Sequence, residues 1–272
     1  MSTSKAIDSG TSKHPYPGTS AGFNPFEDVL TAFDAIPSET FTQAEPFPHI
    51  VLDGLFDDGA IADIHEQLRT LPDDYWEKNN EQGIEVKWRS KWQSEYSIPE
   101  PAREIVRFLN SGVFLKSLSR LTGIDKLIPD PYYTGGGFNL IEPGGHLDVH
   151  ADGNWHDAMG VHRRLNLIVY LNANWHESWG GALNFYDTSA QDVVTAVLPV
   201  GNRLVVFETH DYSFHGHPDP TCSPVGEGRT SLILYYYTST QRPDSQISEA
   251  RPHSALWRSK GWTDKRGNRS RG

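Results

Sequence analysis

Apolar residues recur at helical spacing in the first half of the chain and at strand-like spacing in the second. After a short extended segment over 46–52, residues 57–71 place isoleucine and leucine on one helical face, and Pro72 ends that helix. Residues 100–122 predict a second helical region, with a break near 111–112. The chain up to about residue 122 is therefore expected to supply helices.

From residue 135 onward, short runs of β-branched and aromatic residues alternate with Gly- and Pro-rich turns. Helical spacing is absent between these runs, which disfavours a parallel βαβ arrangement. The pattern predicts a mainly β fold with flanking helices, a double-stranded β-helix of the jelly-roll or cupin-like kind. The predicted strands are 137–142, 146–151, 163–171, 182–186, 193–198, 203–207, 213–217 and 229–238.

Composition divides the chain into three parts. Residues 1–45 are rich in Ser, Thr, Gly and Pro without periodicity, which predicts a flexible N-terminal leader. Residues 46–240 are expected to form the jelly-roll domain with its N-terminal helices. Residues 241–272 carry eight Lys and Arg against three Asp and Glu, which predicts a basic, solvated C-terminal tail.

The net charge of −11 therefore conceals an acidic body of −16 over residues 1–240. Such a body argues against a nucleic-acid partner, because phosphate binding needs a basic face. No apolar run approaches the roughly 18–20 residues that a membrane span needs, so no membrane partner is expected. The lone Cys222 excludes an internal disulfide framework. With no secretory signal evident at the N-terminus, a cytoplasmic protein is expected.

One predicted strand carries an unusual polar face. Alternation along residues 144–153 places His146, Asp148, His150 and Asp152 on the same side. A face made only of His and Asp is too polar for an ordinary core, so it is either solvated or gathered around a cation.

A His-x-Asp pair and one distant histidine can form the facial triad of non-haem iron enzymes, which leaves three metal positions open on one side. His215 and His217 share a face of a later predicted strand and are both candidates for the third ligand. Spacing alone therefore offers more ligands than a triad needs.

A basic residue begins the last predicted strand. Arg229 and Ser231 share one face of the apolar stretch 229–237, which indicates a central, buried strand. A buried arginine must meet an anion. That anion is either a structural Asp or Glu or the carboxylate of a dicarboxylic co-substrate.

The motifs that contain these residues follow one another in an order that is typical of a known enzyme family. The chain resembles the prolyl-4-hydroxylase-like branch of the iron(II)/2-oxoglutarate oxygenases over roughly residues 46–258. The matching motifs are Gly-Gly-x-Leu-x-x-His-x-Asp at 144–152, Arg-Arg-Leu-Asn-Leu-x-x-Tyr-Leu-Asn at 163–172, Trp-Gly-Gly-x-Leu-x-x-Tyr-Asp at 179–187, Phe-His-Gly-His-Pro at 214–218 and Arg-x-Ser at 229–231.

The resemblance implies specific roles. It makes His150, Asp152 and His215 the metal ligands, and it pairs Arg229 with the C5 carboxylate of 2-oxoglutarate. The cofactors it implies are Fe(II), 2-oxoglutarate as co-substrate, and O2. Related halogenases have a small residue at the position of Asp152, so the aspartate favours hydroxylation. Further co-substrate contacts are expected from Ser231, Asn139 and Asn166.

The expected reaction is hydroxylation of an unactivated C–H bond in a small metabolite, with release of succinate and CO2. The alternatives are a protein hydroxylase of the prolyl type and a cupin-like metalloprotein that does not use 2-oxoglutarate. The segment Lys87–Trp92 is expected to be either a substrate lid or an ordinary surface loop. The oligomeric state is left open.

Overall fold

A computed structural model describes residues 26–81, 83–248 and 251–263 of the chain. Its centre is one path of hydrogen-bonded antiparallel strands, ordered β1-β11-β8-β13-β5-β3-β6-β12-β9-β10. Their bounds are β1 His49–Asp53, β3 Glu85–Ser90, β5 Gly137–Ile141, β6 Leu147–Ala151, β8 Val161–Tyr170, β9 Leu183–Tyr186, β10 Val193–Val197, β11 Arg203–Glu208, β12 His215–His217 and β13 Arg229–Thr238.

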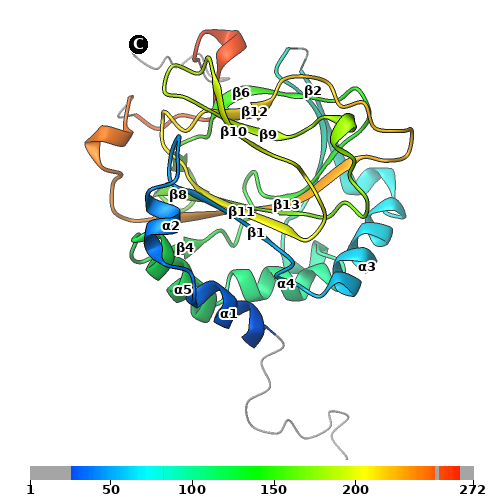
Figure 1. Cartoon of the computed structure of the whole chain (residues 1–272), viewed down its shortest axis with the longest axis horizontal. Coiled ribbons are helices and arrows are strands. Elements are labelled where there is room, and N and C mark those ends of the chain that lie inside the picture. Colours follow the sequence, from blue (N-terminus) through cyan, green and yellow to red (C-terminus); the bar gives the residue numbers. More distant parts are fainter. Residues whose placement is uncertain (1–25, 82, 249–250, 264–272) are drawn as a thin grey trace, which may run out of the picture.

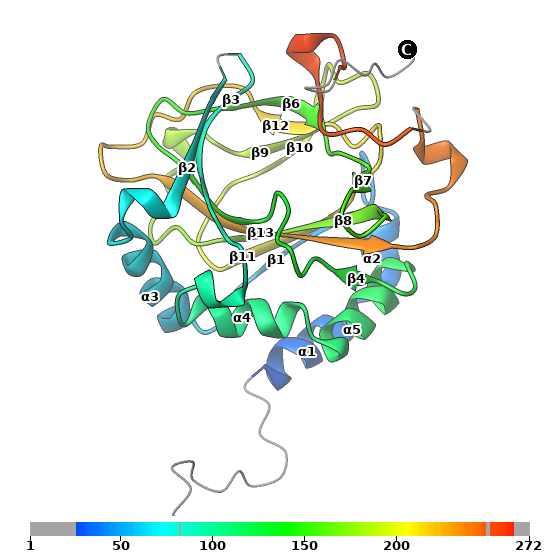
Figure 2. The ribbon, with the colours of Figure 1, turned by 180° about the vertical axis from the view of Figure 1, so that it is seen from behind.

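The path folds into two facing layers. The strands β1, β11, β8, β13 and β5 form a helix-backed layer, and β6, β12, β9 and β10 form an outer layer (Figure 1). β3 pairs with both β5 and β6 and so joins the layers along one side (Figure 2). Four more strands attach beside the path: β2 Trp76–Glu81, β4 Ile128–Pro129, β7 Trp155–His156 and β14 Leu256–Trp257. The predicted double-sheet fold class is confirmed.

Helices cover one face of the helix-backed layer (Figure 1). The predicted break near residue 111 separates two of them, and Asp57 caps another by accepting a hydrogen bond from the Ala60 amide. The helices are α1 Glu27–Asp34, α2 Ser38–Thr42, α3 Asp58–Arg69, α4 Ala102–Leu109 and α5 Gly112–Thr122. None of the helices in the described residues is both long and apolar enough to span a membrane.

Strand alternation decides which side chains meet the helices and which face the space between the layers. On β8, Leu167 and Val169 pack in the core under the helices, whereas Ile168 and Tyr170 pack with the outer layer. On β13, Leu232 likewise faces the helices. Alternation places Asn166 of β8, Ser231 of β13 and Asn139 of β5 on the inner side, so their polar side chains point into the space between the layers.

Both ends of the predicted domain differ from expectation. The predicted leader is wrong for residues 26–45, because Phe33 on α1 and Phe41 on α2 are fully buried in the main core. The predicted tail is not wholly solvated, since Arg242 is buried and Trp257 on β14 pairs with β6. Residues 1–25 and 264–272 lie outside the described residues.

The segment Lys87–Trp92 also differs from both expectations. Residues 87–90 belong to β3, and Trp92 is buried against Phe138 and Tyr133. The segment is therefore part of the sheet that joins the layers. Strands β2 and β3 were not predicted.

Candidate active site

Two strands of the outer layer bring the three predicted metal ligands together. His150 on β6 and His215 on β12 are direct partners in the antiparallel register, and Asp152 follows β6 immediately. One ligand atom from each of the three lies within 4.8 Å of the others. The Nε2 atoms of His150 and His215 lie 3.7 Å and 3.9 Å from Oδ1 of Asp152. All three side chains are buried.

Backbone carbonyls orient both histidine rings. Nδ1 of His150 donates to the carbonyl of Asp148, and Nδ1 of His215 donates to the carbonyl of Ser213, each over 2.9 Å. A carbonyl only accepts, so the Nε2 lone pairs are left to face the centre of the triad. Burial, reinforced by the charge of His150, lowers the pKa of His215 to about 4. The ring of His215 is therefore neutral at physiological pH, as a metal ligand must be.

The carboxylate of Asp152 is held in its charged form. Burial by itself would raise the pKa of Asp152, but the side chains of His150 and His215 and the charge of Arg163 outweigh burial and hold that pKa well below its usual range. Oδ2 accepts a hydrogen bond from Nδ2 of Asn166 over 3.0 Å. The donor set of two imidazoles and one anchored carboxylate fits a divalent iron site with one open side.

Asn166 was expected to bind the co-substrate, but its Nδ2 donates a hydrogen bond to Asp152. Its Oδ1 has no hydrogen-bond partner among the described residues. Nδ2 of Asn139 on β5 also has no hydrogen-bond partner among the described residues, as a contact with a co-substrate would require. The two asparagines thus differ in their hydrogen bonds although both face the same interior space.

Arg229 begins β13 and is buried, with 5% of its surface exposed. Its Nε donates to the carbonyl of Gly181 over 2.7 Å, and Nη2 donates to the hydroxyl of Tyr170 over 3.0 Å. Among the described residues, no carboxylate lies within ion-pair distance of Arg229. The alternative of a structural Asp or Glu partner therefore finds no support, and the guanidinium is left to balance an external anion.

Several buried polar atoms beside Arg229 also lack partners among the described residues. They are Oγ of Ser231, Nδ2 of Asn139 and both ring nitrogens of His217. Ser231 on β13 pairs with Asn139 on the neighbouring strand β5 and with Tyr170 on the other neighbour, β8. Unpaired buried donors cost free energy unless a ligand satisfies them. This cluster fits a small, doubly charged molecule with several oxygen atoms.

A family model described as the 2OG-Fe(II) oxygenase superfamily matches residues 136–237, a stretch that contains the triad and Arg229. Over these residues the chain is similar to this superfamily. The similarity implies Fe(II), 2-oxoglutarate and O2 as cofactors, and the donor set and the unpaired polar atoms just described fit the first two.

Known proteins similar to this chain include several prolyl hydroxylases. One curated relative is the mouse (Mus musculus) prolyl 3-hydroxylase OGFOD1, 28% identical over 227 residues, which cover 77% of this chain. The match spans only 36% of that relative's length. A prolyl hydroxylase from Trichoplax adhaerens, solved with a peptide fragment of the hypoxia inducible factor oxygen degradation domain, superimposes with a TM-score of 0.55 at 16% identity, covering 76% of this chain and 91% of that one.

Two further solved structures share the fold. Prolyl 4-hydroxylase from Phytophthora capsici has a TM-score of 0.55 at 19% identity, covering 88% of this chain and 74% of that one. Prolyl-4-hydroxylase from Pseudomonas putida has a TM-score of 0.51 at 15% identity, covering 77% of this chain and 98% of that one. At these identities the likeness concerns the fold alone.

A cavity of about 610 Å³ opens beside the triad. Its walls include Arg163, whose guanidinium lies 3.8 Å from the ring centre of Tyr235 and whose Nη1 lies 4.0 Å from Asp152. Trp155 also lines the cavity. Arg163 sits in the matched motif, but its charge near the metal centre was not recognised from the sequence.

The far wall of the cavity is built from the C-terminal residues 252–257. Trp257 pairs with His150 in the strand register and stacks on its ring, with centroids 4.6 Å apart and an interplanar angle of 27°. This contact was missed because residues 241–272 were expected to form a solvated tail. No local pattern around Trp257 identifies a metal ligand as its neighbour.

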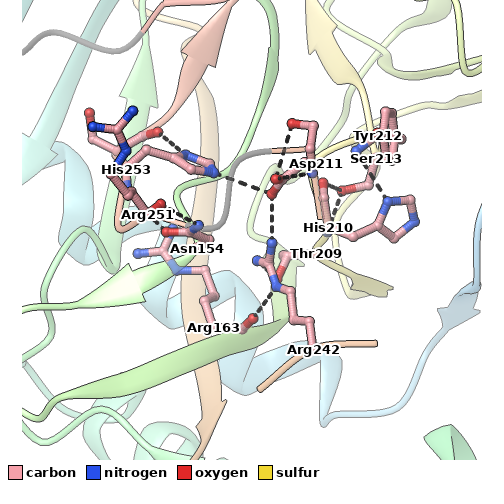
Figure 3. Close-up of polar contacts among 12 residues, drawn as sticks. Asn154, Arg163, Thr209, His210, Asp211, Tyr212, Ser213, Arg242, Arg251 and His253 are labelled. Carbon is pink, nitrogen blue, oxygen red and sulfur yellow. Dashed lines mark hydrogen bonds and ion pairs between the residues drawn. The ribbon is translucent and has the colours of Figure 1, made fainter. Parts of the chain in front are cut away.

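A buried ionic cluster holds this wall in place (Figure 3). Asp211, in the loop before β12, pairs with Arg242 over 2.9 Å and with Nε2 of His253 over 3.2 Å. It also accepts a hydrogen bond from the Ser248 amide over 2.7 Å. Nδ1 of His253 donates to the carbonyl of Ser254 over 2.7 Å. The chain after β13 is thus tied to the loop that leads into His215.

Proposed function

We propose that this chain is an Fe(II)- and 2-oxoglutarate-dependent hydroxylase. His150, Asp152 and His215 would hold the iron, and Arg229 would pair with the C5 carboxylate of 2-oxoglutarate. The observation that carries the proposal is the meeting of this triad with a buried arginine that has no acid partner among the described residues. A cupin-like enzyme without 2-oxoglutarate would leave the charge of Arg229 unbalanced.

Iron and 2-oxoglutarate, when bound, supply the oxidising chemistry, which consumes O2, releases succinate and CO2, and inserts one oxygen atom into a substrate C–H bond. The chain's own residues do the positioning. Asn166 orients the carboxylate of Asp152, and the Ser213 and Asp148 carbonyls orient the imidazoles. The three triad side chains are buried, which limits their contact with water and strengthens the electrostatic interactions among them.

For the substrate, we infer a prolyl residue within a polypeptide. The sequence favoured a small metabolite, but the named relatives are prolyl hydroxylases, and one solved neighbour holds a peptide. The cavity supports this choice by its extent, because it runs from β2 and β3 on one side to residues 252–257 on the other. A pocket of this size lies within the range that admits ligands larger than one amino acid.

Mass spectrometry of the products tests both levels of the proposal. The protein is incubated with Fe(II), 2-oxoglutarate and air, together with either a library of proline-containing peptides or free amino acids including L-proline. The proposal expects a peptide to gain one oxygen atom on proline in proportion to the succinate formed. Modification of a free amino acid alone would restore the small-metabolite alternative, and succinate formation would still support the oxygenase.

A further inference from the structure

His217 is a buried histidine that the proposed iron site does not use. It lies on β12 two residues after His215, so both side chains point into the space between the layers. Gly216 separates them and packs tightly on β6, where an added Cβ would lie 2.7 Å from the Asp148 carbonyl oxygen. The strand therefore has little freedom to turn the ring of His217 elsewhere.

The ring of His217 has an unmet hydrogen-bonding capacity. Only 2% of the residue is exposed, and neither ring nitrogen has a hydrogen-bond partner among the described residues. A neutral imidazole always carries one N–H donor and one acceptor. Leaving such groups buried and unpaired is costly, which is why buried polar side chains in native proteins almost always meet a partner or a ligand.

The surroundings of His217 indicate which ligand is missing. One side of the space between the layers carries His217, and the other carries Arg229, the buried cation that has no acid partner among the described residues. The two residues come from opposite layers, His217 from β12 and Arg229 from β13. Gly181, which precedes β9, accepts a hydrogen bond from Arg229, and β9 is also a neighbour of β12. A carboxylate at this place would be reached from both layers.

We propose that His217 donates a hydrogen bond to the C5 carboxylate of 2-oxoglutarate, from the layer opposite Arg229. The assignment rests on the proposed function. It makes His217 a positioning residue that helps to select a dicarboxylic 2-oxo acid over one that ends in a methyl group. The metal triad does not depend on it.

Ligand binding to the metal-loaded protein, measured without oxygen turnover, tests the assignment. Calorimetry on the Mn(II)-loaded protein compares 2-oxoglutarate with 2-oxopentanoate, which has the same chain but lacks the second carboxylate. His217→Phe keeps a ring and removes the donor, so the affinity for 2-oxoglutarate should fall about 10- to 100-fold, as expected for a hydrogen bond to a charged group. The affinities for 2-oxopentanoate and for Mn(II) should stay within about 2-fold.

Two other variants sharpen the comparison. His217→Gln retains an N–H donor and should recover part of the lost affinity, whereas His217→Leu repeats the loss if the phenylalanine variant does not fold. His146→Phe, at a half-buried position before β6, serves as the matched control and should bind both ligands like the wild type.

The outcomes separate the two proposals. Equal weakening of 2-oxoglutarate and 2-oxopentanoate, or no weakening of either, overturns the role of His217 and leaves the proposed function standing. Failure of the wild-type, Mn(II)-loaded protein to bind 2-oxoglutarate overturns the proposed function, and the role of His217 with it.

Discussion

Asn166 donates a hydrogen bond from Nδ2 to Oδ2 of Asp152 over 3.0 Å, while Oδ1 of the same carboxylate faces Nε2 of His150 and of His215. Oδ2 of the carboxylate therefore accepts the hydrogen bond from Asn166, and Oδ1 is placed to bind a metal. Contacts of this kind around a metal ligand commonly influence the affinity of the metal as much as the ligand's own position does.

Replacing Asn166 with Ala should weaken metal binding about 10- to 100-fold, because Asp152 loses the donor that orients it. A competition titration of Mn(II) or Zn(II) against a chromophoric chelator measures this change. Asn139→Ala is the control, because Asn139 has no hydrogen bond to a triad residue and should keep the metal affinity of the wild type. An unchanged affinity in Asn166→Ala would show that Asp152 needs no such support.

Arg229→Ala should weaken 2-oxoglutarate binding by about two to four orders of magnitude, since breaking a buried ion pair costs roughly 3–5 kcal/mol. Arg229→Lys should recover only part of this, because an ammonium group cannot reproduce the planar guanidinium fork. Titration of succinate formation with 2-oxoglutarate, with the metal content assayed in parallel, gives both quantities. A variant that unfolds without a specific 2-oxoglutarate defect would instead indicate a structural arginine.

Trp257→Ala should lower the metal affinity about 2- to 10-fold, because an aromatic ring stacked on His150 contributes roughly 0.5–1.5 kcal/mol. Trp257→Phe should retain most of the affinity. Trp155→Ala is the matched control: its ring lines the same cavity but packs on His162 and not on a triad residue. The same chelator competition measures all three, and equal losses in the two alanine variants would argue against a specific effect of the stacking on His150.

The Asp211 cluster predicts a pH-dependent contribution to stability. Burial opposes ionisation of Asp211, but His253 and Arg242 outweigh it and lower its pKa from 3.8 to about 2. A lowered carboxyl pKa stabilises the fold above the unfolded-state value, and that stabilisation is lost as the pH falls toward the folded-state value. The contribution is therefore complete above about pH 4 to 5 and is lost between about pH 4 and pH 2.

Asp211→Asn should accordingly be less stable than the wild type by at least about 2 kcal/mol at neutral pH. The difference in the free energy of unfolding between the wild type and Asp211→Asn should become smaller as the pH falls below 4. Urea unfolding of both proteins at pH 7, 4 and 2.5 measures it. A gap that stays constant over this range would mean that the charge of Asp211 contributes nothing.

Long apolar elements were predictable from the sequence because each carries its own pattern. The strand predicted over 229–238 matches β13, Arg229–Thr238, and the helix predicted over 57–71 contains α3, Asp58–Arg69. The order of the motifs also led to the prediction that His150, Asp152 and His215 form one metal site. The structure places those residues together.

The features that were missed lack such a local pattern. β2 and β3 carry charged residues such as Glu77 and Arg89 where an alternating strand would carry apolar ones, because these strands border an open cavity. β14 is only two residues long, and its partner β6 lies more than a hundred residues earlier in the chain. In α1, by contrast, Val29 and Phe33 do have helical spacing, and the Ser- and Gly-rich composition of the preceding residues obscured it.

The most direct test of the central claim is the conversion of 2-oxoglutarate to succinate under air, measured on the wild type and on His215→Ala with and without Fe(II). The proposed site predicts that succinate forms only with the wild type and only with Fe(II), and that His215→Ala, which loses one of three ligands, forms none while remaining folded by circular dichroism. Succinate formation by the wild type after complete removal of iron, or undiminished formation by His215→Ala, would contradict it.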